Sequence, residues 1–182
     1  WVDFKVTAKA MQEAFRYDVN TCQSSPHLNW VDLLSYLGTR YGGDFSKYST
    51  KDLDTLAEQL LSGKTLEELT ANLKYYTYYR QAYGAVLDGL VGQYDIQIAA
   101  ENAPLFATPA VNSDGTTDPD RVWVTKYGLK AFSPIAKGFP YQDYDDFGVS
   151  RSYGYKRQHL GHDMMGQVGT PIIAVESGYV EA

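Results

Sequence analysis

The sequence predicts an α+β protein, with an N-terminal helical bundle over residues 1–98 followed by a truncated antiparallel β domain. Apolar residues recur every three to four positions between cap residues in the first part of the chain, which is typical of amphipathic helices. Residues 99–121 are rich in Pro, Asn, Asp and Gly, so they are expected to form a linker or irregular segment. Short apolar runs separated by Gly then indicate β-strands over residues 122–182.

Cap residues delimit the expected helices. Helices are expected at about residues 7–20, 29–43 and 49–63, the second opened by an Asn cap and the third by a Ser or Thr cap, with glycines ending both. The Thr-x-x-Glu of residues 65–68 has the form of a capping box, worth about 1 kcal/mol. The helical repeat continues over residues 75–90, where a stripe of Tyr is expected to face other helices. Together these segments indicate a bundle of four or five helices.

Composition excludes several classes of protein. The chain has 182 residues and a net charge of −6, without a run of Lys or Arg that would bind a row of phosphates, so nucleic acid is not an expected partner. Its one cysteine, Cys22, excludes an intrachain disulfide and a Cys-based zinc cluster. No apolar run approaches the roughly 20 residues needed to span a bilayer, so any membrane anchor is expected outside these residues. Composition indicates no oligomeric state.

Candidate chemistry is concentrated in residues 157–174, whose core is His159-x-Gly161-x-Asp163. If this stretch is a strand, His159 and Asp163 share one face, and the glycine between them leaves room for an ion. Several glycines argue against a helix here. Imidazole nitrogen and carboxylate oxygen suit Zn²⁺, whereas the alternative is a weak surface ion pair without function. His162 is expected on the opposite face, as a supporting donor or simply exposed.

A family resemblance strengthens the metal hypothesis. The string Arg157-x-His159-x-Gly161-x-Asp163, followed by Gly169-Thr170-Pro171-Ile172, resembles the first metal-binding motif of the lysostaphin/LytM peptidoglycan zinc metalloendopeptidases and the strand pair after it. Upstream, Phe147-Gly148-x-Ser150-Arg151 is similar to the family's lead-in, a Phe-Gly turn followed closely by Arg, here with one extra residue. The resemblance covers about residues 130–182 and does not extend to the helices.

The resemblance implies roles for particular side chains. His159 and Asp163 would be the first two zinc ligands, and Arg151, Arg157 and His162 would bind substrate or support the site. The family's third ligand is a His in a later H-x-H motif, whose other His and a separate upstream His assist catalysis. These 182 residues contain three histidines and no H-x-H motif, so the chain looks truncated and no catalytic residue is assigned in it. Weak or absent zinc binding and no turnover are therefore expected of it.

The same resemblance implies a function at the bacterial cell wall. Expected is the hydrolysis of peptide bonds in peptidoglycan by zinc-activated water, outside the cytoplasmic membrane of a Gram-positive bacterium. The alternative is a non-catalytic LytM-like scaffold or binding module at the cell envelope. The helical part is expected to position substrate or act as a spacer, because residues 36–43 lack the Glu of a lysozyme-like site. The pair Asp145-Asp146 is interpreted as part of a solvated loop rather than as a glycosidase pair.

Overall fold

The computed structural model describes residues 5–144, 146–152, 154–159 and 161–175. The chain divides into two compact units, Trp1–Lys130 and Ala131–Ala182. The protein is therefore of mixed helix and strand content, as predicted, but the boundary lies later than expected. The expected linker over residues 99–121 is wrong, because it contains one complete strand and the start of another.

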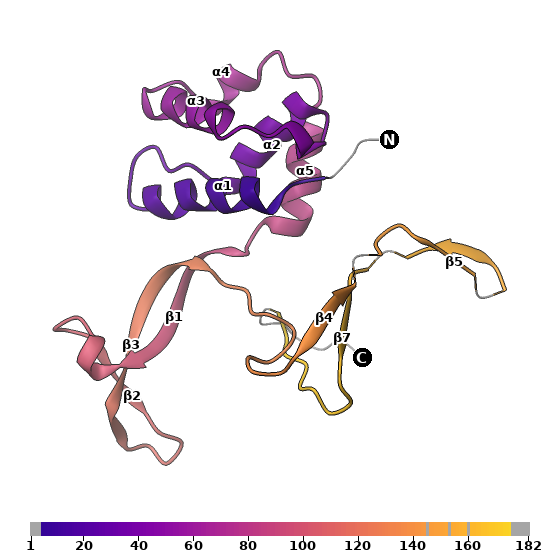
Figure 1. Ribbon diagram of the computed structural model, residues 1–182. Helices are drawn as coiled ribbons and strands as arrows, with labels where there is room; N and C mark the ends of the chain where they lie inside the picture. Colours follow the sequence, from indigo (N-terminus) through magenta and orange to yellow (C-terminus); the bar gives the residue numbers. More distant parts are fainter. Residues whose placement is uncertain (1–4, 145, 153, 160, 176–182) are drawn as a thin grey trace. The chain divides into compact units, whose positions relative to one another are not determined.

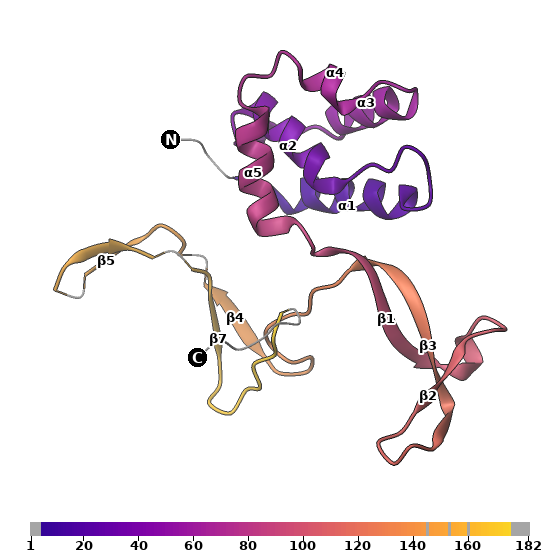
Figure 2. The same cartoon turned by 180° about the vertical axis from the view of Figure 1, so that it is seen from behind.

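The helices group together at the start of the first unit (Figures 1 and 2). Helix α2 contacts three of the others, α1, α3 and α5, and so lies at the centre of the bundle. The three helices predicted up to residue 63 and the helix start at residue 65 are confirmed, but the helical stretch expected to continue to residue 90 is interrupted after Thr70, and the tyrosine-rich repeat forms a separate fifth helix. The helices in the described residues are α1 (Ala8–Thr21), α2 (Trp30–Tyr41), α3 (Thr50–Leu61), α4 (Leu66–Thr70) and α5 (Tyr76–Leu87), with a short 3₁₀ turn η1 (Phe45–Lys47).

The predicted Asn29 cap and the Thr65–Glu68 capping box are present, whereas Ser49 precedes α3 without a side-chain cap hydrogen bond. The Thr7 hydroxyl accepts a hydrogen bond from the backbone N–H three residues later, at 3.3 Å. The Asn29 side chain accepts two such bonds at the start of α2, and Gly42 ends that helix in the left-handed conformation, with φ of 65°. Thr65 and Glu68 form both hydrogen bonds of the capping box. These local signals explain why the helices begin and end where the sequence predicts.

One apolar core holds the bundle together. Its centre is the inner face of α2, which packs against α1, α3 and the tyrosines of α5. Gly38 of α2 allows a close approach, since a Cβ there would lie 2.7 Å from the Tyr83 hydroxyl oxygen. The largest fully buried apolar side chains are Val31, Leu33, Leu34, Leu37, Phe45, Leu53 and Leu56.

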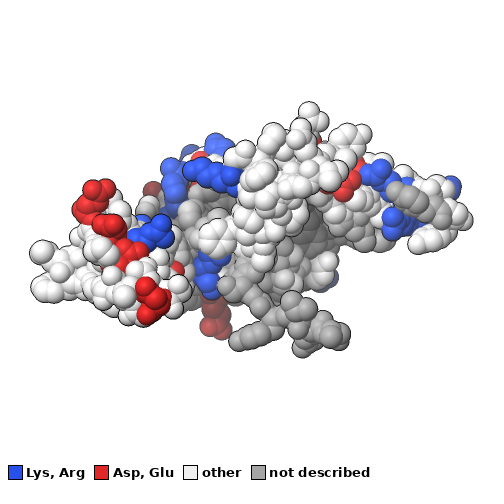
Figure 3. All heavy atoms as spheres, turned by 90° about the horizontal axis from the view of Figure 1, so that it is seen from below, with Lys and Arg blue, Asp and Glu red and all other residues white. Residues whose placement is uncertain are grey.

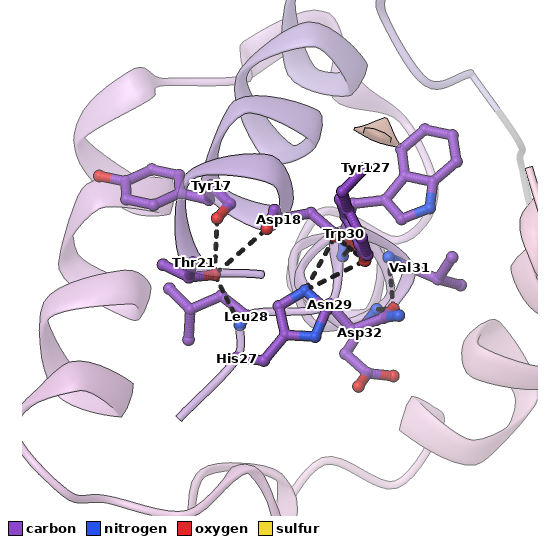
Figure 4. Close-up of polar contacts among 10 residues, drawn as sticks. All are labelled: Tyr17, Asp18, Thr21, His27, Leu28, Asn29, Trp30, Val31, Asp32 and Tyr127. Atoms are coloured by element: carbon purple, nitrogen blue, oxygen red, sulfur yellow. Dashed lines mark hydrogen bonds and ion pairs between the residues drawn. The ribbon is translucent and has the colours of Figure 1, made fainter. Parts of the chain in front are cut away.

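A buried carboxylate lies at the edge of this core (Figure 4). Asp18 of α1 is fully buried. It accepts hydrogen bonds from the Trp30 backbone N–H at 2.8 Å and from the Tyr127 hydroxyl at 2.7 Å. The His27 Nε2 lies 2.9 Å from the same carboxylate. Burial and the neighbouring Asp18 charge raise the pKa of Tyr127 above its ordinary value. Because Tyr127 belongs to a strand, these bonds tie that strand to the helices.

That strand is part of a three-stranded antiparallel sheet in the first unit. The sheet comprises β1 (Val91–Ala99), β2 (Thr108–Val111) and β3 (Thr117–Leu129), in the order β1-β3-β2. Strand β1 pairs with β3 along its whole length, and the pairing of β2 with β3 is irregular between Pro109 and Ala110. A short 3₁₀ turn, η2 (Ala100–Asn102), follows β1.

The second unit is built from two small antiparallel ladders. Strand β4 (Tyr141–Tyr144) pairs with β7 (Asp163–Gly166), and β5 (Ser150–Ser152) pairs with β6 (Lys156–Gln158). This confirms the antiparallel pairing expected after residue 130. The buried side chains among its described residues are Ile135 and Asp146.

Charge is distributed in small groups over the surface. On the face drawn in Figure 3, the Lys and Arg side chains of the described residues form separate clusters divided by uncharged and acidic surface. The absence of a nucleic-acid partner stays a prediction. None of the helices in the described ranges combines the length and the apolar composition that a bilayer-spanning segment needs.

Glu13 joins α1 to the start of α3, and its contacts lead to a prediction about pH. The Tyr48 and Thr50 hydroxyls donate hydrogen bonds to its carboxylate, at 2.5 and 3.2 Å. Burial alone would raise the pKa of Glu13, but these hydrogen bonds and the charges of Lys9 and Arg16 outweigh it and hold the pKa below its ordinary value. A carboxylate of lowered pKa stabilises the fold above its unfolded pKa, and this stabilisation is lost as pH falls through the folded pKa.

Glu13→Gln is therefore expected to destabilise the protein by about 1 kcal/mol at neutral pH and to reduce the loss of stability below about pH 5. The measurement is the free energy of urea unfolding as a function of pH. Gln12→Ala, at an exposed neighbouring position of α1, is the control and should give a curve parallel to the wild type. Equal slopes in acid for Glu13→Gln and the wild type would contradict the prediction.

Candidate metal centre

Three side chains of the second unit converge on one point. Asp146, His159 and Asp163 each offer a ligand atom, and these atoms all lie within 4.8 Å of one another. Nε2 of His159 lies 3.3 Å from Oδ1 of Asp146 and 3.3 Å from Oδ1 of Asp163. The Asp146 side chain is only 6% exposed, whereas the side chains of His159 and Asp163 are 23% and 40% exposed. The cluster is thus anchored on a buried carboxylate and open on one side.

The two ladders place these residues. Asp146 lies in the turn between β4 and β5, and Asp163 opens β7 beside β4. His159 directly follows β6, where its backbone N–H donates to the Val149 carbonyl at 3.0 Å and its carbonyl accepts from the Gly148 N–H at 2.6 Å. These bonds hold the histidine against the Phe-Gly turn, in which Gly148 has a φ of 81° that favours glycine.

The strand expected to run from His159 through Asp163 is wrong. Strand β6 ends at Gln158 and β7 begins at Asp163, Gly161 lies in a bend, and Leu160 lies outside the described residues. The physical reason is pairing, because β6 pairs with β5 but β7 pairs with β4, so the chain must change partner between them. His159 and Asp163 nevertheless come together, through the bend rather than by alternation along one strand.

The three side chains lie close enough together to hold one metal ion. In a tetrahedral site with bonds of about 2.1 Å, neighbouring ligand atoms lie about 3.4 Å apart, close to the two separations of 3.3 Å around His159. Neither oxygen of Asp146 nor Nε2 of His159 makes a hydrogen bond. Nε2 of His159 is therefore near an oxygen of each carboxylate but does not have hydrogen-bonding geometry to either. The cluster thus offers one nitrogen and two carboxylate oxygens, and zinc accepts both kinds of donor atom.

Arg151 of β5 reaches the same cluster. Its Nη2 contacts Oδ2 of Asp146 and lies 3.5 Å from Oδ2 of Asp163. The guanidinium therefore balances the charge of both carboxylates through their Oδ2 atoms, whereas His159 lies near their Oδ1 atoms. Among the residues expected to support the site, Arg151 is the one that the structure brings to it.

The other two expected support residues are His162 and Arg157, and His162 pairs outside the cluster. Nε2 of His162 lies 3.0 Å from Oδ1 of Asp143, and both side chains are exposed. Arg157 lies opposite Arg151 in the β5–β6 ladder and is exposed.

The interpretation of Asp146 as part of a solvated loop is wrong, because this residue is 5% exposed. The Asp-Asp pair has the composition of a surface loop, and nothing local distinguishes its second residue. The sequence feature that could have identified Asp146 is its position directly before the Phe-Gly turn of the motif.

Comparison with known proteins adds no relative, since no family model, no curated protein and no solved structure matches this chain. The likeness to the lysostaphin/LytM family therefore depends on the motif residues alone.

Proposed function

We propose that the protein is a zinc-dependent endopeptidase that hydrolyses peptide bonds of bacterial peptidoglycan. The observation that carries the proposal is the convergence of one imidazole and two carboxylates, from His159, Asp146 and Asp163, at the spacing of zinc ligands. The substrate, the LytM-type fold of the second unit and a location outside the cytoplasmic membrane are proposed from the resemblance of the H-x-G-x-D motif.

The residues of the cluster have distinct roles in this proposal. Bound zinc supplies a water of lowered pKa and polarises the scissile carbonyl. His159, Asp163 and Asp146 would hold the ion, with Asp146 as the buried ligand. Arg151, once turned away from the carboxylates, has the planar donors that bind a carboxylate of a peptide substrate. The peptide must approach from the side on which Asp163 is exposed.

A second candidate is a non-catalytic module of the cell envelope. The contact between Arg151 and Asp146 favours it, because the guanidinium compensates the buried charge without any ion. The two candidates differ in whether metal binding is followed by bond cleavage.

The test combines zinc binding with hydrolysis. Zinc is titrated into the protein in competition with a chromophoric chelator, and the zinc-loaded protein is then incubated with purified peptidoglycan while newly released amino groups are measured. We expect one zinc ion per chain. The expectation of no turnover assumed two ligands, and with Asp146 as a third the expected result is slow release of amino groups that EDTA abolishes. Zinc binding without release would support the non-catalytic module, and no zinc binding would contradict the peptidase.

A further inference from the structure

The cluster holds more negative charge than its own histidine can balance. Both oxygens of the buried Asp146 lack a hydrogen bond, and so does the Nε2 of His159 that faces one of them. A buried carboxylate without a cation is costly. The nearest cation among the described residues is the Arg151 guanidinium, which touches Asp146 and lies 3.5 Å from Asp163. Arg151 therefore supplies the positive charge that a bound metal ion would supply.

We propose that Arg151 is a built-in competitor of the metal, and that a divalent cation binds to Asp146, His159 and Asp163 by displacing its guanidinium. This inference rests on the metal site of the proposed function and adds its regulation. Arginine stays protonated in proteins and has no lone pair to offer, so it cannot become a ligand. Its positive charge would repel an ion bound to the same two carboxylates. Arg151 and the metal therefore exclude each other.

The surroundings of Arg151 permit the exchange. Its side chain is 32% exposed, so the guanidinium has a route into water while its apolar stem remains on the protein. Asp146, in contrast, is buried and cannot follow it. Strand β5 pairs only with β6 among the described strands, in a ladder of three residue pairs. The exchange thus requires a change of one side chain and leaves the ligands in place.

Competition lowers the apparent affinity for metal by the fraction of molecules in which the site is free. If Arg151 leaves the carboxylates in about a tenth of the molecules, removing it tightens metal binding about tenfold. Without metal, the same change leaves Asp146 uncompensated and destabilises the second unit. Tighter metal binding together with a less stable metal-free protein is the signature of a competitor, whereas a residue that only supports the ligands would weaken binding when removed.

The experiment measures binding of Zn²⁺ by isothermal titration to the 182-residue chain and its variants, and the visible spectrum of Co²⁺ as a report on ligand number. Arg151→Gln is expected to bind Zn²⁺ about tenfold more tightly than the wild type. Arg151→Lys, which keeps the charge but not the planar fork, is expected to lie between them. Lys156→Gln is the control, since it removes an exposed cation from the same ladder and should leave the affinity unchanged.

Asp146→Asn tests the shared partner of Arg151 and the metal, and it is expected to weaken Zn²⁺ binding at least tenfold. Unchanged or weaker binding by both Arg151 variants, or unchanged binding by Asp146→Asn, would overturn the inference. If the wild type still binds zinc and His159→Ala does not, the metal site of the proposed function survives that failure. If the wild type and every variant fail to bind zinc, both proposals are wrong.

Discussion

Asp18→Ala is expected to lower the free energy of unfolding by about 3 to 5 kcal/mol, the largest stability effect we predict. The substitution removes the shared acceptor of the Trp30 N–H and the Tyr127 hydroxyl and leaves His27 without its buried partner. For a chain of this size, the loss corresponds to a fall in melting temperature of about 2–4 °C per kcal/mol. Urea unfolding followed by circular dichroism measures it.

Two comparisons isolate the carboxylate of Asp18. Asn20→Ala, at an exposed position on the same helix, should change the stability by less than about 0.5 kcal/mol. Tyr127→Phe should cost about 1 kcal/mol, and adding it to Asp18→Ala should cost less than the sum of the two. A loss below about 1 kcal/mol for Asp18→Ala would show that the buried carboxylate is not the acceptor on which the three donors depend.

His159→Ala is expected to abolish zinc binding. Its imidazole is the only nitrogen ligand of the candidate cluster and lies between the two carboxylates. Loss of a ligand should exceed the roughly 10–100-fold loss of affinity caused by removing a group that merely supports a ligand. The measurement is competition with a chromophoric chelator, supported by the loss of any zinc-induced rise in melting temperature.

The matched control is His162→Ala, three residues further along the chain. His162 pairs with Asp143 outside the cluster, so this variant should bind zinc like the wild type. Equal affinities for His159→Ala and the wild type, or loss of binding in His162→Ala alone, would show that the metal site is not the one described.

Helices were predictable from the sequence because their signals are local. Asn29 opens α2 and the Thr65–Glu68 capping box opens α4, each within a few residues of the backbone groups that it satisfies. The apolar repeat then fixes which face is buried. Such features need no knowledge of the remaining chain, so the bounds of α1 to α3 and the start of α4 agree closely with the prediction.

In the first unit, β1 falls largely in the part expected to be helical, and β2 and the start of β3 were missed because prolines suggested a linker. The strand expected from Val122 is the rest of β3. Pro109 lies in the edge strand β2, where a missing N–H is tolerated, and next to the irregularity in its pairing with β3. Pro119 falls among the residues of β3 that have no partner in β2, between Asp118 and Val122. Both prolines therefore avoid the regular part of the ladder, which only the paired structure reveals.

The candidate site was predictable only in part, for a related reason. The motif indicated His159 and Asp163, and the structure brings them together. Asp146 was missed because its burial depends on contacts made after the chain has returned through β6 and β7. Asp18 was missed for the same reason. A charged residue on a helix is expected to be exposed unless its partners from elsewhere in the chain are known.

The bond between Asp18 and Tyr127 spans 109 residues, and this has a consequence for biosynthesis. When α5 has emerged from the ribosome, Tyr127, whose hydroxyl the buried carboxylate needs, has not yet emerged. The bundle therefore reaches its final hydrogen bonding only when the returning strand of the sheet emerges from the exit tunnel. The helices and the first sheet thus mature as one unit, in keeping with their grouping within Trp1–Lys130.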